Sequence, residues 1–170
     1  MKTLYEYLTE SKIDLEKEID KRIKKDGDQF LCTWDPDDPE ESLLPEITQE
    51  YGLSELWLKM DNRQQGALRT DHDVVELVSI QVLYDKRGQG IAKKVLKILA
   101  DWADKRNVVL TGDPDDMFNT PLAALYKLYG SIGMEPTEKF DTDPKKFHLH
   151  KIARYPNGEN EQHYKLANTE

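Results

Sequence analysis

The chain has 170 residues, 38% of them hydrophobic and 34% charged, so it is long enough and apolar enough to fold around one core. Its formal net charge of −9 argues against binding to nucleic acid or anionic membranes and favours cationic partners. The single cysteine, Cys32, excludes an internal disulfide. No apolar run approaches the roughly 20 residues of a membrane span, and no secretion signal follows Lys2, so we expect a cytoplasmic protein.

The N-terminal segment is predicted to be helical over residues 3–25, in two pieces. A capping box over residues 11–14, with Asp in the place of Glu, predicts that the second piece begins at Ser11. Leu15, Ile19 and Ile23 then recur every four residues and predict one narrow apolar stripe.

The middle of the chain contains three predicted strands and the most regular predicted helix. Short strands are predicted at residues 30–34 and 56–60, and an acidic, proline-broken loop over residues 35–46 lies between them. Residues 74–84 are almost continuously apolar, which predicts a central strand covered on both faces. Apolar residues at helical spacing predict a long amphipathic helix over residues 90–106.

The C-terminal part is predicted to continue this alternation. We expect a short strand at residues 108–110 and a helix that begins with the N-cap and N1 pair at 120–121. A late strand is predicted at residues 147–154, followed by a hairpin turn at 157–158 that returns through residues 164–166. This order predicts one mixed α/β layer.

A glycine-rich turn joins the central strand to the long helix over residues 82–92. Its glycines let the backbone approach a ligand, and successive N–H groups at a helix N-terminus can cradle a pyrophosphate. Lys93 occupies the third glycine position of a dinucleotide fingerprint, and the chain has no Gly-Lys-Ser/Thr of a Walker loop. Arg87, Gly90 and Ala92 match the coenzyme A pattern Gln/Arg-x-x-Gly-x-Gly/Ala.

With this loop the chain resembles the GNAT superfamily of acetyl-CoA-dependent N-acetyltransferases. A second stretch, from Asn119 to Gly133 with Met134 in place of Phe, is similar to the family pattern Asn … Ala … Leu-Tyr-x-x-x-Gly-Phe. The resemblance implies a mixed, mostly antiparallel central sheet flanked by helices, with a splayed central strand. It also implies an acetyltransferase domain over residues 28–170, preceded by a helical extension over residues 1–27.

The resemblance implies acetyl-CoA as the cofactor. Its pantetheine arm would pair with the backbone of the central strand as an added strand, and its pyrophosphate would lie on the glycine loop. The residues expected to hold the cofactor are Ile80, Gln81, Val82, Arg87, Gly88, Gln89, Gly90, Ile91, Ala92, Lys93, Asn119 and Tyr126.

The resemblance also implies direct attack of an amine on the thioester, with one group to take a proton and another to supply one. Glu76 is the candidate base, because it is the only acid in the central apolar run, where burial would raise its pKa. A strand-edge carboxylate in solvent or paired to a basic group is the alternative. Tyr129 is the candidate acid that protonates the departing thiolate. There are two alternatives: Tyr129 is only a core residue, or Tyr126 takes the role of the acid.

The acceptor is expected to be a cationic amine, such as a lysine side chain, a protein N-terminus or a polyamine. Acidic residues at 35–46 and at Asp113, Asp115 and Asp116 follow strands near the expected site, although a solvated acidic surface explains them too. Three classes of function stay open: an active N-acetyltransferase, a non-catalytic acetyl-CoA- or partner-binding module, and a transferase for aminoacyl-tRNA, which the acidic charge disfavours. A homodimer is one option for the assembly.

The histidines form no recognisable set of metal ligands. His148 and His150 share one face of the predicted late strand and are expected to be exposed, so no metal is expected.

Residues 1–11 are similar to the leader of tailed-phage internal capsid proteins. That resemblance implies a phage-encoded protein, packaged in the virion and delivered to the host cytoplasm. An ordinary amphipathic starting helix explains the same residues.

Overall fold

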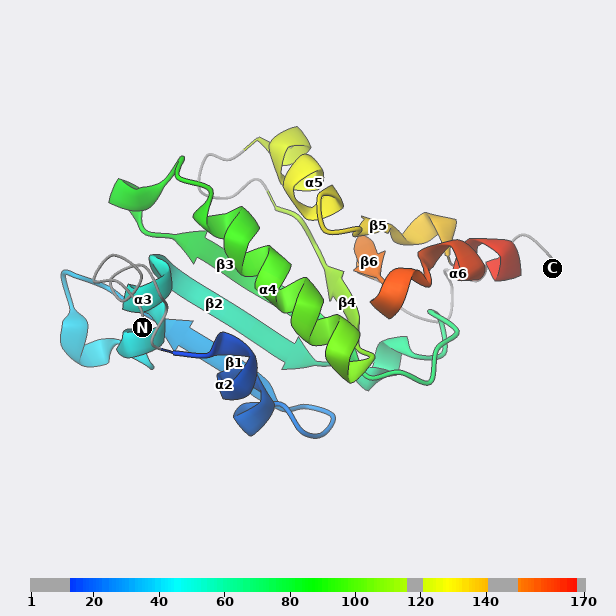
Figure 1. Ribbon diagram of the computed structural model, residues 1–170, viewed down its shortest axis with the longest axis horizontal. Helices are drawn as coiled ribbons and strands as arrows, with labels where there is room; N and C mark the ends of the chain where they lie inside the picture. The colour runs from blue at the N-terminus through cyan, green and yellow to red at the C-terminus, as the bar shows by residue number, and fades with distance from the viewer. Residues whose placement is uncertain (1–12, 116–120, 141–149, 168–170) are drawn as a thin grey trace, which may run out of the picture.

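A computed structural model describes residues 13–115, 121–140 and 150–167 of the chain, and the side chains up to residue 163 (Figure 1). The first predicted helical piece, the phage-like leader and His148 lie outside these residues. Among the described residues, six strands form one sheet in the order β1-β2-β3-β4-β6-β5. Only β3 and β4 are parallel, so the predicted mixed and mostly antiparallel sheet is confirmed. The strands are β1 Gln29–Thr33, β2 Leu53–Met60, β3 Val74–Val82, β4 Val109–Gly112, β5 Glu135–Pro136 and β6 Ile152–Arg154.

In the described part of the chain, five α-helices accompany the sheet: α2 Leu15–Arg22, α3 Pro45–Tyr51, α4 Ile91–Arg106, α5 Leu122–Gly130 and α6 Asn160–Ala167. In Figure 1, α4 crosses one face of the sheet with α2 beside β1. The helical period of α4 turns its apolar stripe toward β3 and β4, and this stripe is fully buried in the main core. A smaller cluster on the opposite face contains Leu68, Val74, Val109, Phe140, Ala153 and Tyr155. None of the helices in the described part of the chain has the length and apolarity needed to cross a membrane.

The helix predicted to begin at Ser11 instead begins after Asp14, which caps α2 by accepting a hydrogen bond from the Lys17 N–H at 3.2 Å. The apolar stripe of α2 is buried in the same core as α4. At the rim of this packing, the Trp102 indole N–H donates to Asp20 at 2.8 Å. The described part of the N-terminal extension therefore packs directly on the sheet and on α4.

The acidic loop is shorter than predicted, because α3 begins at Pro45. Proline suits the first helical turn, where its missing N–H costs no hydrogen bond. The short helix is held by tertiary contacts: Ile47 and Thr48 are buried, and the Tyr51 hydroxyl donates to the Ile13 carbonyl at 2.6 Å.

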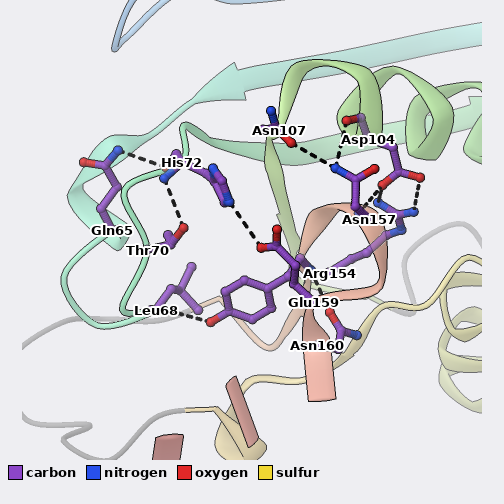
Figure 2. A network of polar contacts seen from close by, with 11 residues as sticks. Gln65, Leu68, Thr70, His72, Asp104, Asn107, Arg154, Asn157, Glu159 and Asn160 are labelled. Atoms are coloured by element: carbon purple, nitrogen blue, oxygen red, sulfur yellow. Dashed lines mark hydrogen bonds and ion pairs between the residues drawn. The ribbon is translucent and has the colours of Figure 1, made fainter. Parts of the chain in front are cut away.

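The predicted hairpin at Asn157–Gly158 is wrong, since a 3₁₀ turn over Pro156–Gly158 leads into α6. The turn is held by the C-terminal end of α4 (Figure 2). The Asn157 backbone N–H donates to Asp104 at 2.8 Å, and its side-chain amide donates to the Asp104 carbonyl and to Asn107. These contacts, between residues distant in the sequence, replace the returning strand that the local Asn-Gly signal predicts.

The same end of α4 carries an ion pair between Asp104 and Arg154 of β6 (Figure 2). The guanidinium donates to both carboxylate oxygens, at 2.9 and 3.0 Å, and the Arg154 side chain is 12% exposed. Burial alone would raise the pKa of Asp104, but the hydrogen bonds from Arg154 and Asn157 hold this pKa below its usual value.

Asp104→Asn should lower the free energy of unfolding by about 2 kcal/mol at pH 7, because it leaves a largely buried guanidinium without its anion. The pKa of Asp104 is lower in the folded state than in the unfolded state. The stabilisation is therefore complete above pH 3.8, the ordinary pKa of this carboxyl, and is lost as the pH falls through the lowered pKa. Urea unfolding at pH 7 and at pH 3 should therefore show a difference that shrinks at the acidic pH. Asp101→Asn, at an exposed position of the same helix, is the control. An equal difference at both pH values would contradict the role of the ionised carboxylate.

Candidate active site

The strands β3 and β4 separate halfway along β3. β4 pairs with β3 only over residues 74–77, and the last partners are Leu77 and Gly112. On its other side β3 stays paired with β2 up to Val82. The adjacent residues Trp57 and Leu58 of β2 pair with Ser79 and Leu77, so the residue between these two has no partner. Val78 is therefore an extra residue, a β-bulge, and bulges bend a strand and increase its twist. Beyond it, the edge of β3 over residues 78–82 has no strand partner in the described part of the chain.

A cavity of about 370 Å³ lies at this opening. Its walls are the unpaired half of β3, the glycine loop before α4, the segment after β4 and one side of α5. Basic side chains of Lys86, Arg87 and Lys93 line it at the loop, whereas Asp113 and Asp115 line it after β4. The cavity is therefore cationic at one wall and anionic at another. The cationic wall suits the phosphates of a ligand, and the anionic wall suits a cationic acceptor.

The glycine loop has a backbone that glycine alone adopts readily. Gly88 and Gly90 have φ values of +79° and +77°, and Gly90 is the N-cap of α4. A Cβ built at either position would meet no heavy atom within 4 Å, so the space beside the loop is open. The Arg87 side chain donates to the Val82 carbonyl at 3.3 Å, which ties the loop to the end of β3. The loop thus brings glycine backbone and the N-terminus of α4 to the cavity.

Most of the residues expected to hold a cofactor meet at this cavity. Gln89 and Tyr126 are not among its lining residues, and Asn119 lies outside the described chain. The lining includes Ile80, Gln81, Val82, Arg87, Gly88, Gly90, Ile91, Ala92 and Lys93. Sequence reasoning missed Val78, Ser79, Lys86, Leu125 and Leu128, which also line it. The apolar stripe of α5 was the available signal for the two leucines, but such a stripe equally describes a helix that faces only a core.

Tyr129 lies on α5 and lines the cavity together with Leu125 and Leu128. Burial raises the pKa of its phenol, so the group keeps its proton at neutral pH and can donate it. Tyr126, one turn earlier, packs against the main core without lining the cavity. Of these two tyrosines, therefore, only Tyr129 lies at the cavity.

Glu76 lies on the sheet face opposite α4, one residue before the strands part. It pairs with Lys59 of β2 and Thr111 of β4, and its side chain is 19% exposed. Burial raises the pKa of the Glu76 carboxyl; His150 and Lys59 oppose this shift, while Asp113 and Asp61 add to it. Glu76 does not line the cavity.

His150 contradicts the expectation of an exposed strand histidine. It precedes β6, its side chain is only 16% exposed, and its ring lies between two carboxylates. Its Nδ1 is 2.6 Å from Asp113 Oδ2, and its Nε2 is 3.3 Å from Glu76 Oε2. Asp113 also accepts the Lys151 backbone N–H at 2.7 Å, which brings this segment against the end of β4. Acidic neighbours that are remote in sequence therefore explain the burial of the ring.

The sequence model of the acetyltransferase (GNAT) family matches residues 33–130, more than half of the chain. The match runs from the end of β1 to the end of α5, so it includes the splayed strands, the glycine loop and Tyr129. No curated protein and no solved structure matches the chain. The extent of the family match and the agreement of the sheet with the expected fold show that the chain belongs to the GNAT acetyltransferase family.

Proposed function

We propose that the protein transfers an acetyl group from acetyl-CoA to a primary amine, with Glu76 as the base and Tyr129 as the acid. The observation that carries this proposal is the unpaired edge of β3 beside a cavity that ends at the glycine loop. An extended pantetheine arm can add to this edge as a strand, with its amides bonded to backbone groups of residues 78–82. The pyrophosphate then reaches the loop at Gly88 and Gly90.

Each chemical step has a group to perform it. The amine nitrogen attacks the thioester carbon and forms the new C–N bond, and a backbone N–H of β3 stabilises the oxyanion. Glu76 takes the proton that the attacking amine loses. Breakage of the C–S bond releases a thiolate, which takes the phenol proton of Tyr129. After turnover, Glu76 gives one proton to solvent and Tyr129 regains one from it, so both groups return to their starting states.

Charge favours a cationic acceptor. Asp113 and Asp115 lie at the wall of the cavity after β4. Thr33 at the end of β1 pairs with Glu55 of β2, and Glu55 pairs with Gln81 of β3. The exposed acidic segment 35–41, which follows β1, therefore begins at the same end of the sheet as the splayed half of β3. Carboxylates on two sides of the opening attract a lysine side chain, a protein N-terminus or a polyamine.

Calorimetry with acetyl-CoA, followed by thiol release in the presence of polylysine, spermidine or phenylethylamine, tests the proposal. Cys32 is buried and its pKa is raised to about 12, so the protein itself adds little signal to a thiol assay. We expect binding, and faster release with the polycations than with the monoamine, by a margin that salt reduces. Binding without turnover on any amine would identify a non-catalytic module instead. Absence of binding would contradict the proposal as a whole.

Tyr129→Phe should lower turnover by ~10²-fold or more, with little change in acetyl-CoA affinity, because the ring is kept and only the proton donor is lost. Tyr126→Phe is the matched control on the same helix and should have a small effect. Steady-state rates with the best amine of the screen, combined with calorimetry, measure both quantities. A larger loss in Tyr126→Phe would move the donor role to that residue.

A further inference from the structure

The ring of His150 is held in one orientation by Asp113, which directly follows β4. The Nδ1 atom of the ring lies 2.6 Å from Asp113 Oδ2. A carboxylate only accepts hydrogen bonds, so Nδ1 donates, and in the neutral ring this places the lone pair on Nε2. Asp113 is itself held by the Lys151 backbone N–H, which donates to its other oxygen at 2.7 Å. The lone pair of Nε2 therefore points in a fixed direction.

Three acceptor atoms meet at this nitrogen. His150 Nε2 is buried and makes no hydrogen bond within the described residues. Glu76 Oε2 lies 3.3 Å from it but off the axis of the lone pair, and Asp61 Oδ2 lies 3.9 Å from it. The lone pair and both carboxylate oxygens accept, so none of the three atoms supplies a hydrogen to the others. Such a group of buried acceptors is unfavourable unless a cation lies among them.

A second buried polar atom lacks a partner on the same face of the sheet. Thr111 of β4 pairs with Glu76 in parallel register, so both side chains point to the face opposite α4, and Asp113 follows two residues later. Thr111 is fully buried, and its Oγ1 makes no hydrogen bond within the part of the chain that the structure describes. Buried hydroxyls nearly always have a hydrogen-bond partner. Thr111 therefore indicates that a further polar group, such as a water bound to an ion, belongs beside Glu76.

The distances fit a tetrahedral metal ion. Two ligands of such an ion, with bonds of about 2.05 Å, lie about 3.3 Å apart at the corners of the tetrahedron. His150 Nε2 and Glu76 Oε2 have this separation. A shift of about 0.6 Å in the carboxylate brings Asp61 Oδ2 to the same distance from Nε2. Arg63, which donates to Asp61, has a side chain that is 77% exposed, so it can follow that shift.

The charge and the donor atoms of the cluster select a divalent transition metal. The carboxylates of Glu76, Asp61 and Asp113 outnumber the nearby cationic groups of Lys59 and Arg63, which makes the cluster attractive to cations. Zn²⁺ prefers imidazole nitrogen together with carboxylate oxygen, whereas Mg²⁺ and Ca²⁺ prefer oxygen alone. A carboxylate on the outer nitrogen of a metal-bound imidazole fixes the ring and makes the inner nitrogen more basic, and Asp113 occupies that position.

We propose that His150 Nε2, Glu76 and Asp61 bind a divalent transition metal ion such as Zn²⁺. Asp113 positions the histidine, and water supplies the fourth ligand beside Thr111. The pattern of histidines in the sequence predicts no metal, because the three ligands come from segments that are remote from one another in the chain.

Occupancy of the metal site regulates the reaction, a consequence that rests on the proposed function of Glu76 as the base. An ion bound to the carboxylate keeps it from taking a proton from the amine. The metal-free protein is therefore the active form, and the metal-bound protein is inhibited. Binding of the ion depends only on the ligand cluster, so it can be tested without acetyl-CoA or an amine.

Calorimetry with Zn²⁺ at pH 7, on the full chain after treatment with EDTA and its removal, tests the site. We expect one Zn²⁺ per chain, with affinity lowered by ~100-fold or more in His150→Gln and by ~10-fold in Asp113→Asn. Asp61→Asn keeps the histidine and its positioning carboxylate and should also weaken binding by ~10-fold. His72→Gln is the matched control, because the His72 ring pairs with the Glu159 carboxylate, and it should bind as the wild type does (Figure 2).

Absence of Zn²⁺ binding, or equal affinity in the wild type, His150→Gln and Asp61→Asn, would overturn the site. Co²⁺ in place of Zn²⁺ reports the geometry directly. We expect the wild type to give the intense visible absorption of tetrahedral Co²⁺ and Glu76→Gln to lose it, since one ligand is then a neutral amide. The weak spectrum of octahedral Co²⁺ in the wild type would contradict the tetrahedral arrangement.

Mass spectrometry of the acetylated amine measures the effect of the ion on turnover, because Zn²⁺ binds free thiols and disturbs a thiol assay. One equivalent of Zn²⁺ should lower the wild-type rate by ~10-fold or more, and excess EDTA should restore it. The outcomes separate this site from the proposed function. Absence of Zn²⁺ binding, with Glu76→Gln inactive, would overturn the metal site and keep Glu76 as the base. Zn²⁺ bound at the site with unchanged turnover would keep the metal site and overturn Glu76 as the base.

Discussion

Glu76→Gln should lower the rate of acetyl transfer at neutral pH by ~10²- to 10⁴-fold. The amide keeps the size of the side chain and its ability to form hydrogen bonds, but it cannot take a proton from the amine. The wild-type rate should rise with pH through the raised pKa of Glu76, above the ordinary value of 4.5, because only the ionised carboxylate acts as a base. In Glu76→Gln that limb should disappear, and the deficit should shrink at high pH, where the amine, with a pKa of ~10.4, arrives neutral.

Stability separates this effect from misfolding. A carboxyl whose folded-state pKa is raised contributes stability below its unfolded value, and this contribution is lost as the pH rises through the raised pKa. At pH 7 the ionised Glu76 therefore opposes folding, and Glu76→Gln should unfold at the same temperature as the wild type or above it. Glu138→Gln, at an exposed position, is the control for both measurements. An unchanged pH–rate profile in Glu76→Gln would make the carboxylate structural.

Gly90→Asp should weaken acetyl-CoA binding by ~100-fold or more. Two like unit charges a few ångströms apart near a protein surface repel by about 4 kcal/mol, and this carboxylate would stand where the pyrophosphate is expected. The φ of +77° adds strain for any side chain, even though no atom lies within 4 Å of the new Cβ. Calorimetry measures the change in affinity.

Gly27→Asp is the matched control, because Gly27 has a φ of +90° and open space around it but lies in the turn between α2 and β1. The two variants share the added charge and the backbone strain, so their melting temperatures should fall by similar amounts. Only Gly90→Asp should lose affinity. Wild-type acetyl-CoA affinity in a folded Gly90→Asp would contradict the assignment of the loop to the cofactor.

Short-range signals predicted much of the sheet, the long helix and the glycine loop. The apolar period of α4 and the glycines before it are patterns of neighbouring residues, so they can be read without knowledge of the tertiary structure. The position of Tyr129 one turn after Tyr126 was also visible in the sequence. The cavity, however, was needed to favour one over the other, since both tyrosines pack against the core.

Signals at the ends of elements were less reliable. The start of α2 moved from Ser11 to Asp14, and the Asn-Gly pair that resembles a hairpin turn is held by the end of α4 and precedes a helix. Capping and turn preferences are each worth about 1 kcal/mol, so one or two tertiary hydrogen bonds or a few buried side chains can override them.

The sequence by itself determined the family, the glycine loop and the residue types available for the proposed proton transfer. Only the tertiary structure decided which of those residues meet. Strand register places Glu76 one residue before the point where β3 and β4 part. The approach of β6 to β4 brings His150 and Asp113, 37 residues apart, into contact beside it. Register depends on the pairing of whole strands, and one inserted residue reverses which face every later side chain occupies, so no local pattern could reveal this cluster.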